Sequence, residues 1–180
     1  MWSQLKYRIG FGDELSAARA RMHADHEDPR KRFVFSILAI SYPTDPAYRP
    51  EFARTAVRDW YGVGSPAAVV EAITGYVQGS SSTPAYDAFR AAFLARAALP
   101  GGLLTEAESW AWGRRAGERV QQSYRDFAAY AVGYVEGHLD YRRRCGDRDD
   151  RLEHHRQSLA ATAAALGATL WARTPFDTPL

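Results

Sequence analysis

Apolar side chains recur every three or four residues along much of the chain, which is the spacing of one face of an α-helix. Over residues 84–99 this face would carry Tyr86, Phe89, Phe93 and Ala97. The helix would end at Pro100-Gly101-Gly102, because proline and glycine stop helices. We therefore expect an amphipathic helix here, with one side in the core and the other in solvent.

Three more helices are predicted after this one. Thr105 followed by Glu108 has the sequence of a capping box, and Ser123 followed by Asp126 repeats it in a weaker form. The helix after Ser123 would carry an aromatic face: Phe127, Tyr130, Tyr134, His138 and Tyr141. The last helix, over residues 148–172, would carry a bundle-facing seam of Leu152, His155, Leu159, Thr162, Leu166 and Leu170.

The first half of the chain also favours helices. Residues 14–24 are good helix formers, and Pro29 limits that segment. Residues 30–43 have the composition of either a buried strand or a helix; we expect a helix, because no second strand-like segment could accept a strand's hydrogen bonds. Pro50 predicts a helix start, and Ser65-Pro66 predicts another with Ser65 as its N-cap.

These elements predict an all-α, single-domain helical bundle of about seven or eight helices. The length of 180 residues is that of one domain, and 46% hydrophobic residues suffice for a core. Within the domain we distinguish a helical N-terminal part, residues 1–59, a central segment, residues 60–142, and the C-terminal helix, residues 148–172.

Charge and cysteine content narrow the classes of partner. The 23 basic and 21 acidic residues leave a net charge of +2 without a one-signed patch, so nucleic-acid binding is not expected. Cys145 is the single cysteine, which excludes an intramolecular disulfide and a cysteine zinc cage. No apolar run reaches the ~18 residues of a membrane span, and no secretory signal is present, so we expect a cytoplasmic protein.

Three motifs resemble those of a known family. The first is aromatic–Asp–x–x–Arg, here Tyr86-Asp87-Ala88-Phe89-Arg90. The second is a helix start, Leu104-Thr105-Glu106-Ala107-Glu108-Ser109-Trp110. The third is the spaced set Gln121, Tyr124, Phe127, Tyr130 and Gly133. Through them, residues 60–142 resemble DUF1266, a bacterial family of unknown function, although Tyr86 and Arg125 stand where tryptophan is commoner. The resemblance implies a helical bacterial protein and brings no activity, cofactor or catalytic residue.

Asp87 and Arg90 are the first candidates for chemistry. Three residues apart on one helix, they are close enough for an ion pair. Arg90 could then anchor a carboxylate or phosphate with Asp87 orienting it, or the pair could fix how the helix packs; we favour the structural interpretation. His138, between Tyr134 and Tyr141, would need a carboxylate to act as a base, and we expect a core histidine instead.

Other polar clusters carry weaker signals. His23 and His26 lie beside three acidic residues, but their spacing differs from metalloprotease sites and a charged turn is favoured. His154 and His155 point to different helix faces, and the arginines of residues 140–156 are balanced by acids. No P-loop, dinucleotide-binding, serine-hydrolase or HExxH motif is present. We therefore predict neither a metal nor a cofactor.

Two functional hypotheses follow. The first is a non-enzymatic bacterial protein-interaction module: an adaptor, a chaperone-like accessory, or an immunity protein against a secreted toxin. Its partner would be another protein, since arginine, tyrosine and tryptophan are enriched at interfaces. The alternative is a small-ligand binder or enzyme with an interhelical pocket. In that case Asp87, Arg90 and His138 would supply polar groups, and Trp110 and Tyr130 would form the walls. The sequence leaves the oligomeric state open.

Overall fold

The computed structural model describes residues 20–79 and 82–180. Its α-helices are α2 (Pro29–Leu38), α3 (Pro50–Tyr61), α4 (Pro66–Gln78), α5 (Pro84–Ala97), α6 (Glu106–Ser123), α7 (Phe127–Arg144) and α8 (Asp149–Gly167), with 3₁₀ turns η1 (Pro46–Tyr48) and η2 (Trp171–Arg173). These residues contain no strand, which confirms the predicted all-α fold. Of the helix predicted over 14–24, residues 20–24 are helical within a segment that continues to 27, and residues 14–19 lie outside the described part.

Local sequence signals set most helix starts. Proline occupies the first helical position of α2, α3, α4 and α5, where its missing N–H leaves no hydrogen bond unmade. Ser65 caps α4 as predicted, and Thr105 with Glu108 forms the predicted capping box of α6. The predicted cap at Ser123 is wrong. Ser123 ends α6, Tyr124 is extended, and the Asp126 side chain caps α7 by accepting a hydrogen bond from the Ala129 amide.

Helix α5 is the centre of the fold. It contacts α2, α3, α4, α6 and α7, and its side chains are buried around almost the whole circumference. The helix predicted over residues 84–99 is therefore confirmed, but its predicted solvent-facing side is wrong. Alanines separate the larger apolar residues of α5 and let neighbouring helices approach from every side: Ala85, Ala88, Ala91, Ala92, Ala95 and Ala97 are all buried.

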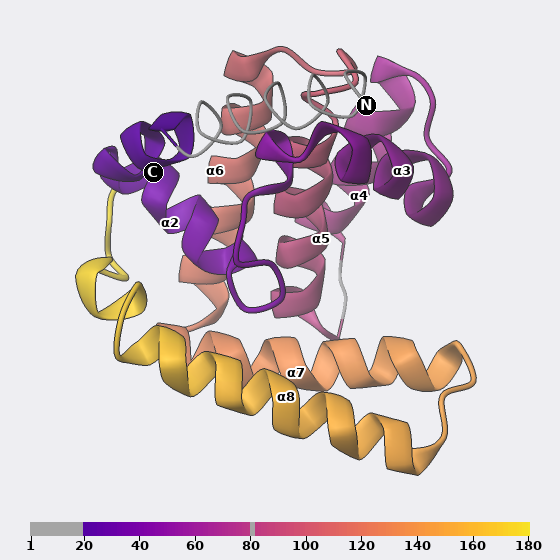
Figure 1. Ribbon diagram of the computed structural model, residues 1–180, viewed down its shortest axis with the longest axis vertical. Helices are drawn as coiled ribbons and strands as arrows, with labels where there is room; N and C mark the ends of the chain where they lie inside the picture. Colours follow the sequence, from indigo (N-terminus) through magenta and orange to yellow (C-terminus); the bar gives the residue numbers. More distant parts are fainter. Residues whose placement is uncertain (1–19, 80–81) are drawn as a thin grey trace, which may run out of the picture.

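Helices α7 and α8 form a hairpin that lies across the lower end of α5 and α6 in Figure 1. Helix α8 packs mainly on α7. Of the predicted seam, Leu152 and Leu159 are buried and the other members are half-buried. The side of α8 that faces away from α7 is therefore largely exposed among the described helices.

Glycines on α6 and α7 allow close helix packing within the chain. A Cβ atom on Gly113 would lie 2.9 Å from Val34, and one on Gly137 would lie 2.6 Å from the Cβ of Tyr86. These two glycines therefore face the interior of the protein. Across residues 20–79 and 82–180, no helix combines the length and hydropathy that crossing a membrane requires.

Candidate functional site

Arg90 lies at the junction of four helices. Its guanidinium carbon is 4.4 Å from the ring centre of Tyr76 on α4 and 5.4 Å from that of Tyr61 on α3. Tyr86 and Tyr141 complete the group at 6.0 and 5.7 Å. Cations are attracted to aromatic faces at these distances. We call Arg90 with these four tyrosines the arginine–tyrosine cluster.

The predicted ion pair between Asp87 and Arg90 is not formed. Both side chains are half-buried, and no salt bridge joins them. The tyrosine rings draw the Arg90 guanidinium away from the acid one turn earlier on α5. Arg90 is therefore held by aromatic contacts, with the backbone carbonyl of Arg90 accepting a weak hydrogen bond from Tyr61 at 3.5 Å.

His138 packs among aromatic rings on α7. Its ring centre is 5.7 Å from Tyr86 and 5.9 Å from Tyr134, and 5.4 Å from that of His155 on α8. Burial lowers the pKa of His138 to about 4, and the nearby His155 and Arg142 add to this effect. The imidazole of this half-buried residue is therefore neutral at neutral pH.

Trp110 lies apart from these groups. The Arg96 guanidinium stacks 3.5 Å from its ring centre, and Lys31 lies 5.0 Å from it. Tyr130 is completely buried, and its hydroxyl donates a 3.0 Å hydrogen bond to the Ile37 carbonyl.

The five predicted site residues therefore do not line a common cavity. Arg90 and His138 share Tyr86 as a neighbour, whereas Trp110 contacts Arg96 and Tyr130 is part of the core. Two cavities on the surface of the described residues are lined by none of the five.

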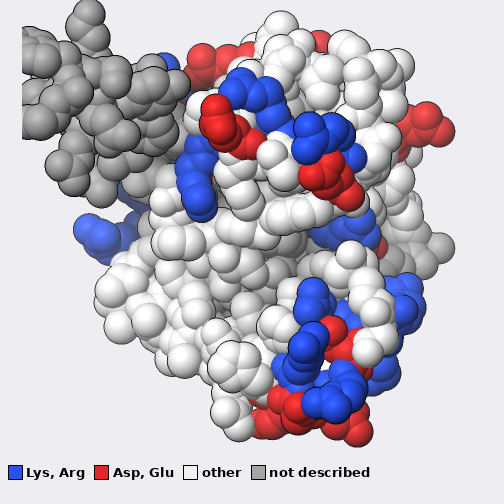
Figure 2. All heavy atoms as spheres, turned by 45° about the vertical axis from the view of Figure 1, so that its right-hand side comes forward, with Lys and Arg blue, Asp and Glu red and all other residues white. Residues whose placement is uncertain are grey.

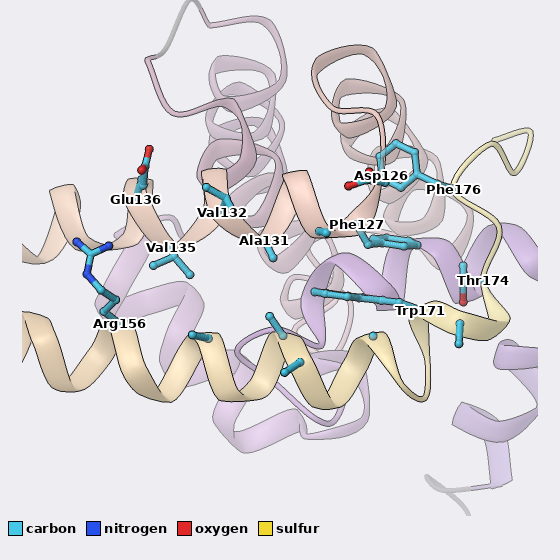
Figure 3. Close-up of a pocket in the computed structure, with 16 residues that line it drawn as sticks. Asp126, Phe127, Ala131, Val132, Val135, Glu136, Arg156, Trp171, Thr174 and Phe176 are labelled. Atoms are coloured by element: carbon cyan, nitrogen blue, oxygen red, sulfur yellow. The ribbon is translucent and has the colours of Figure 1, made fainter.

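The larger cavity is an open groove of about 750 Å³ between α7, α8 and the chain after α8 (Figure 3). Small and apolar side chains dominate its walls: Phe127, Ala128, Ala131, Val132, Val135, Ala160, Ala163, Ala164, Gly167, Trp171, Ala172 and Phe176. Polar residues stand mainly at its ends. Figure 3 shows Arg156 and Glu136 at one end and Asp126 at the other.

The two helix segments beside this groove carry no charge. Residues 127–135 of α7 and 157–172 at the end of α8 and beyond contain no acidic, basic or histidine residue. Much of this surface is nevertheless exposed, including Ala160, Ala164 and Gly167, and Val132 is 62% exposed. A solvent-facing helix normally carries charges on its outer side. We call this groove with its two uncharged segments the uncharged face.

The charges of the hairpin gather at its tip instead. Arg142 pairs with Asp147 at 2.6 Å, and Arg144 pairs with Asp140 at 3.0 Å. Gly146 makes the turn with a φ of +90°, which a glycine adopts without strain. In Figure 2 the tip comes forward at the lower right, where basic and acidic side chains interleave. The acids of residues 140–156 therefore pair with the arginines that they balance in the sequence.

Metal binding finds no support in the described part of the chain. No group of three or more histidine, cysteine, aspartate and glutamate side chains lies close enough together to hold an ion there. The ring of His26 packs against Phe35 at 4.3 Å, and burial lowers the pKa of His26. His155 lies 3.7 Å from Asp147, which already binds Arg142.

The smaller cavity lies between α4 and the loop before α6. Its volume is about 590 Å³, and its two charged residues are Glu71 and Glu108. Glu108 is already engaged by the capping box, where it accepts a 2.8 Å hydrogen bond from the Thr105 amide. The uncharged face is therefore the better candidate for a functional surface.

Sequence reasoning missed this face for an identifiable reason. The last helix was predicted only to face the bundle through its seam, which includes Leu159 and Leu166. The signal was the absence of charge over residues 157–172, eleven of which belong to α8, together with only two buried residues in the seam of that helix, Leu152 and Leu159.

Comparison with known proteins gives one result. The family described as Protein of unknown function (DUF1266) matches residues 12–176. The chain therefore belongs to this family, and the match extends well beyond the motifs of residues 60–142 on both sides. No curated protein and no solved structure matches the chain.

Proposed function

We propose that this member of the DUF1266 family is a non-enzymatic protein-interaction module that binds through its uncharged face. One observation carries the proposal: a groove of about 750 Å³ opens beside two segments that contain no charged residue, and much of the segment on α8 is exposed. An adaptor, an accessory protein and an immunity protein would each use such a surface.

The free energy of burying this face favours association. Each Å² of apolar surface removed from water contributes about 25 cal/mol. The walls contain aromatic anchors, Phe127 and Trp171, whose rings stack 5.3 Å apart, surrounded by alanines. Small side chains permit another helix to approach closely, so the groove suits a helix better than a flat surface.

A second candidate function is the binding of a small anion at the arginine–tyrosine cluster. Arg90 favours it, because this half-buried cation has no salt bridge to an acidic residue of the described chain. The absence of Arg90 from both cavities ranks this candidate below the first. Native mass spectrometry tests this candidate. If the wild type retains an anion and Arg90→Met loses it, anion binding would rank above the protein-interaction function.

Matched lysine variants test the first candidate. Val132 and Thr55 are both exposed in the middle of a helix, and each has an acid four residues later, Glu136 and Asp59. Lysine is therefore tolerated at both positions. A tagged chain should capture a protein partner from lysate of its own host, Thr55→Lys should capture it equally, and Val132→Lys should lose it. Equal capture by all three would contradict the proposal.

A further inference from the structure

A short helical segment, residues 20–27, packs on the rest of the protein through a carboxylate. Asp25 Oδ1 accepts a 2.7 Å hydrogen bond from the Lys31 ammonium, and Asp25 Oδ2 accepts one from the Tyr48 hydroxyl. The Asp25 side chain is only 18% exposed. Burial opposes its ionisation, but the hydrogen bonds from Lys31 and Tyr48 lower the pKa of Asp25 below its usual value. Asp25 is therefore bound as a carboxylate.

Other parts of the fold hold the two donors in place. Lys31 lies on α2, and its ammonium is 5.0 Å from the ring centre of Trp110 on α6, a distance at which a cation is attracted to an aromatic ring. Tyr48 lies in η1, where burial and then Asp25 raise the pKa of its hydroxyl, so that it stays protonated and donates. We call Lys31, Tyr48 and Trp110 the carboxylate site.

The residue after Asp25 makes two further contacts. The His26 ring packs against Phe35 with 4.3 Å between ring centres, and Arg32 donates a 3.1 Å hydrogen bond to the His26 carbonyl. Carbonyls in the last turn of a helix lack a helical partner, and a cation is favoured there. The site therefore suits the C-terminal turn of a helix that carries an acid followed by a ring.

The segment that provides Asp25 is held less firmly than the other helices. Residues 20–27 contain no buried side chain, whereas each helix from α2 to α8 has at least two. Segments with few buried contacts open locally at low free-energy cost. A hinge separates this segment from α2, because Asp28 is extended with a ψ of 117° and Pro29 lacks the N–H that would continue the helix.

The segment also leaves hydrogen-bond donors beside the site unpaired. Arg32 Nε and Trp110 Nε1 are buried and have no hydrogen-bond partner in the described part of the chain. The whole Trp110 residue is only 5% exposed. Buried polar groups in native proteins are normally paired, so residues 20–27 satisfy this region incompletely.

We propose that the carboxylate site binds an acidic helix end of a partner protein, and that Asp25 occupies the site until this partner displaces it. The partner's helix would present an aspartate followed by a histidine or an aromatic residue, as Asp25-His26 does. The carboxylate site is separate from the uncharged face, because Lys31, Tyr48 and Trp110 do not line that groove. The exchange replaces one carboxylate by another on the same two donors.

A fluorescently labelled peptide of residues 20–28, added to the full chain, tests the proposal. Asp25→Asn in the chain removes the competing charge, so the peptide should bind this variant at least about tenfold more tightly than wild type in anisotropy titrations. Glu27→Gln is the matched control: it removes one negative charge from the same segment, but the Glu27 side chain is 77% exposed. The peptide should bind Glu27→Gln as it binds wild type.

Variants of the two donors locate the binding. Lys31→Met or Tyr48→Phe, each combined with Asp25→Asn, should abolish the gain in affinity. Tyr48→Phe removes a single hydroxyl, so the test stands even if Lys31→Met does not fold, as judged by circular dichroism. Hydrogen exchange of the amides of residues 20–27 should be faster in Asp25→Asn than in wild type, while the amides of α5 stay protected.

Three outcomes overturn the proposal. The first is a peptide affinity that is equal in wild type and Asp25→Asn, or the absence of binding to Asp25→Asn at millimolar peptide. The second is an equal gain in Glu27→Gln, which would show that net charge alone attracts the peptide. The third is a gain that survives in both donor variants. Val132→Lys combined with Asp25→Asn should retain the gain, so failure here leaves the proposed function of the uncharged face standing.

Discussion

Asp45 and Arg96 form an ion pair in the interior of the protein, with 2.8 Å between the carboxylate Oδ2 and the guanidinium Nε. Their side chains are only 2% and 1% exposed. Arg96 also donates to the Ser109 hydroxyl at 3.1 Å, and Asp45 accepts from the Ala47 amide at 2.8 Å. The pair joins the loop before α3 to α5 and α6.

Removal of one member of this pair should destabilise the fold strongly. Asp45→Ala leaves the Arg96 charge buried without a counterion, and we expect the free energy of unfolding to fall by about 3–5 kcal/mol. Urea denaturation measures it. The double variant Asp45→Ala/Arg96→Met should lose less than the single variant, because no charge is then stranded. A loss below about 1 kcal/mol in the single variant would show that water reaches the site.

Asp87 and Arg90 should respond very differently to substitution, although one family motif contains both. Arg90→Ala removes the contacts with four tyrosines, and we expect a loss of about 2–3 kcal/mol in the free energy of unfolding. Asp87→Ala should stay within about 0.5 kcal/mol because the acid forms no ion pair with Arg90. Equal losses in the two variants, measured by urea denaturation, would mean that the pair forms in solution.

Two glycine-to-alanine substitutions should have opposite signs. In Gly75→Ala the new methyl group meets nothing within 4 Å, so better helix propensity should stabilise α4 by about 0.5–1 kcal/mol. In Gly137→Ala the methyl group would lie 2.6 Å from the Cβ of Tyr86, and separating α7 from α5 should cost about 1–3 kcal/mol. Thermal unfolding shows whether each variant is more or less stable than the wild type. A stabilising Gly137→Ala would show that the helices have room to separate.

Acid should weaken the fold through His138. The pKa of the imidazole is about 6.5 in an unfolded chain and about 4 in the native protein. Between these values the unfolded state binds a proton that the native state does not, so the free energy of unfolding falls as the pH decreases from about 6.5 to about 4. Because the ring is only half-buried, we expect His138 to contribute about 1–2 kcal/mol of this loss.

The control for this pH dependence is His138→Phe, which keeps an aromatic ring beside Tyr86 and Tyr134 but cannot be protonated. Its free energy of unfolding should depend less steeply on pH in the same interval. A residual slope is expected, because burial also lowers the pKa of His26. Identical slopes for wild type and His138→Phe in urea titrations would contradict the assignment.

The sequence predicted those structural features that depend on residues close together in the chain, such as helix starts and caps. Proline and the Ser65 and Thr105 caps located helix starts correctly, since these interactions span only three or four positions. The burial of α5 could not be predicted in this way: an alanine on a helix looks the same whether water or another helix faces it. The pairing of Asp45 with Arg96 joins residues 51 positions apart, and no local pattern marks it.

The candidate site was the least predictable part. The motif Asp87–Arg90 suggested an ion pair from spacing alone, whereas Tyr61, Tyr76 and Tyr141 come from three other helices and reach Arg90 only in the folded chain. The groove likewise exists only because α8 lies on α7. Its absence of charge was visible in the sequence, but the exposure that makes this absence unusual was not.

The contacts of residues 171–178 affect the order in which the protein folds during translation. The Trp171 indole donates a 3.0 Å hydrogen bond to the Ser36 carbonyl, and Gln121 donates to the carbonyls of Phe176 and Thr178. The surface of α2 around Ser36 is therefore covered only by Trp171, which is translated 135 residues later. In a nascent chain on the ribosome, the surfaces of α2 and α6 that contact residues 171–178 would stay exposed until these residues emerge.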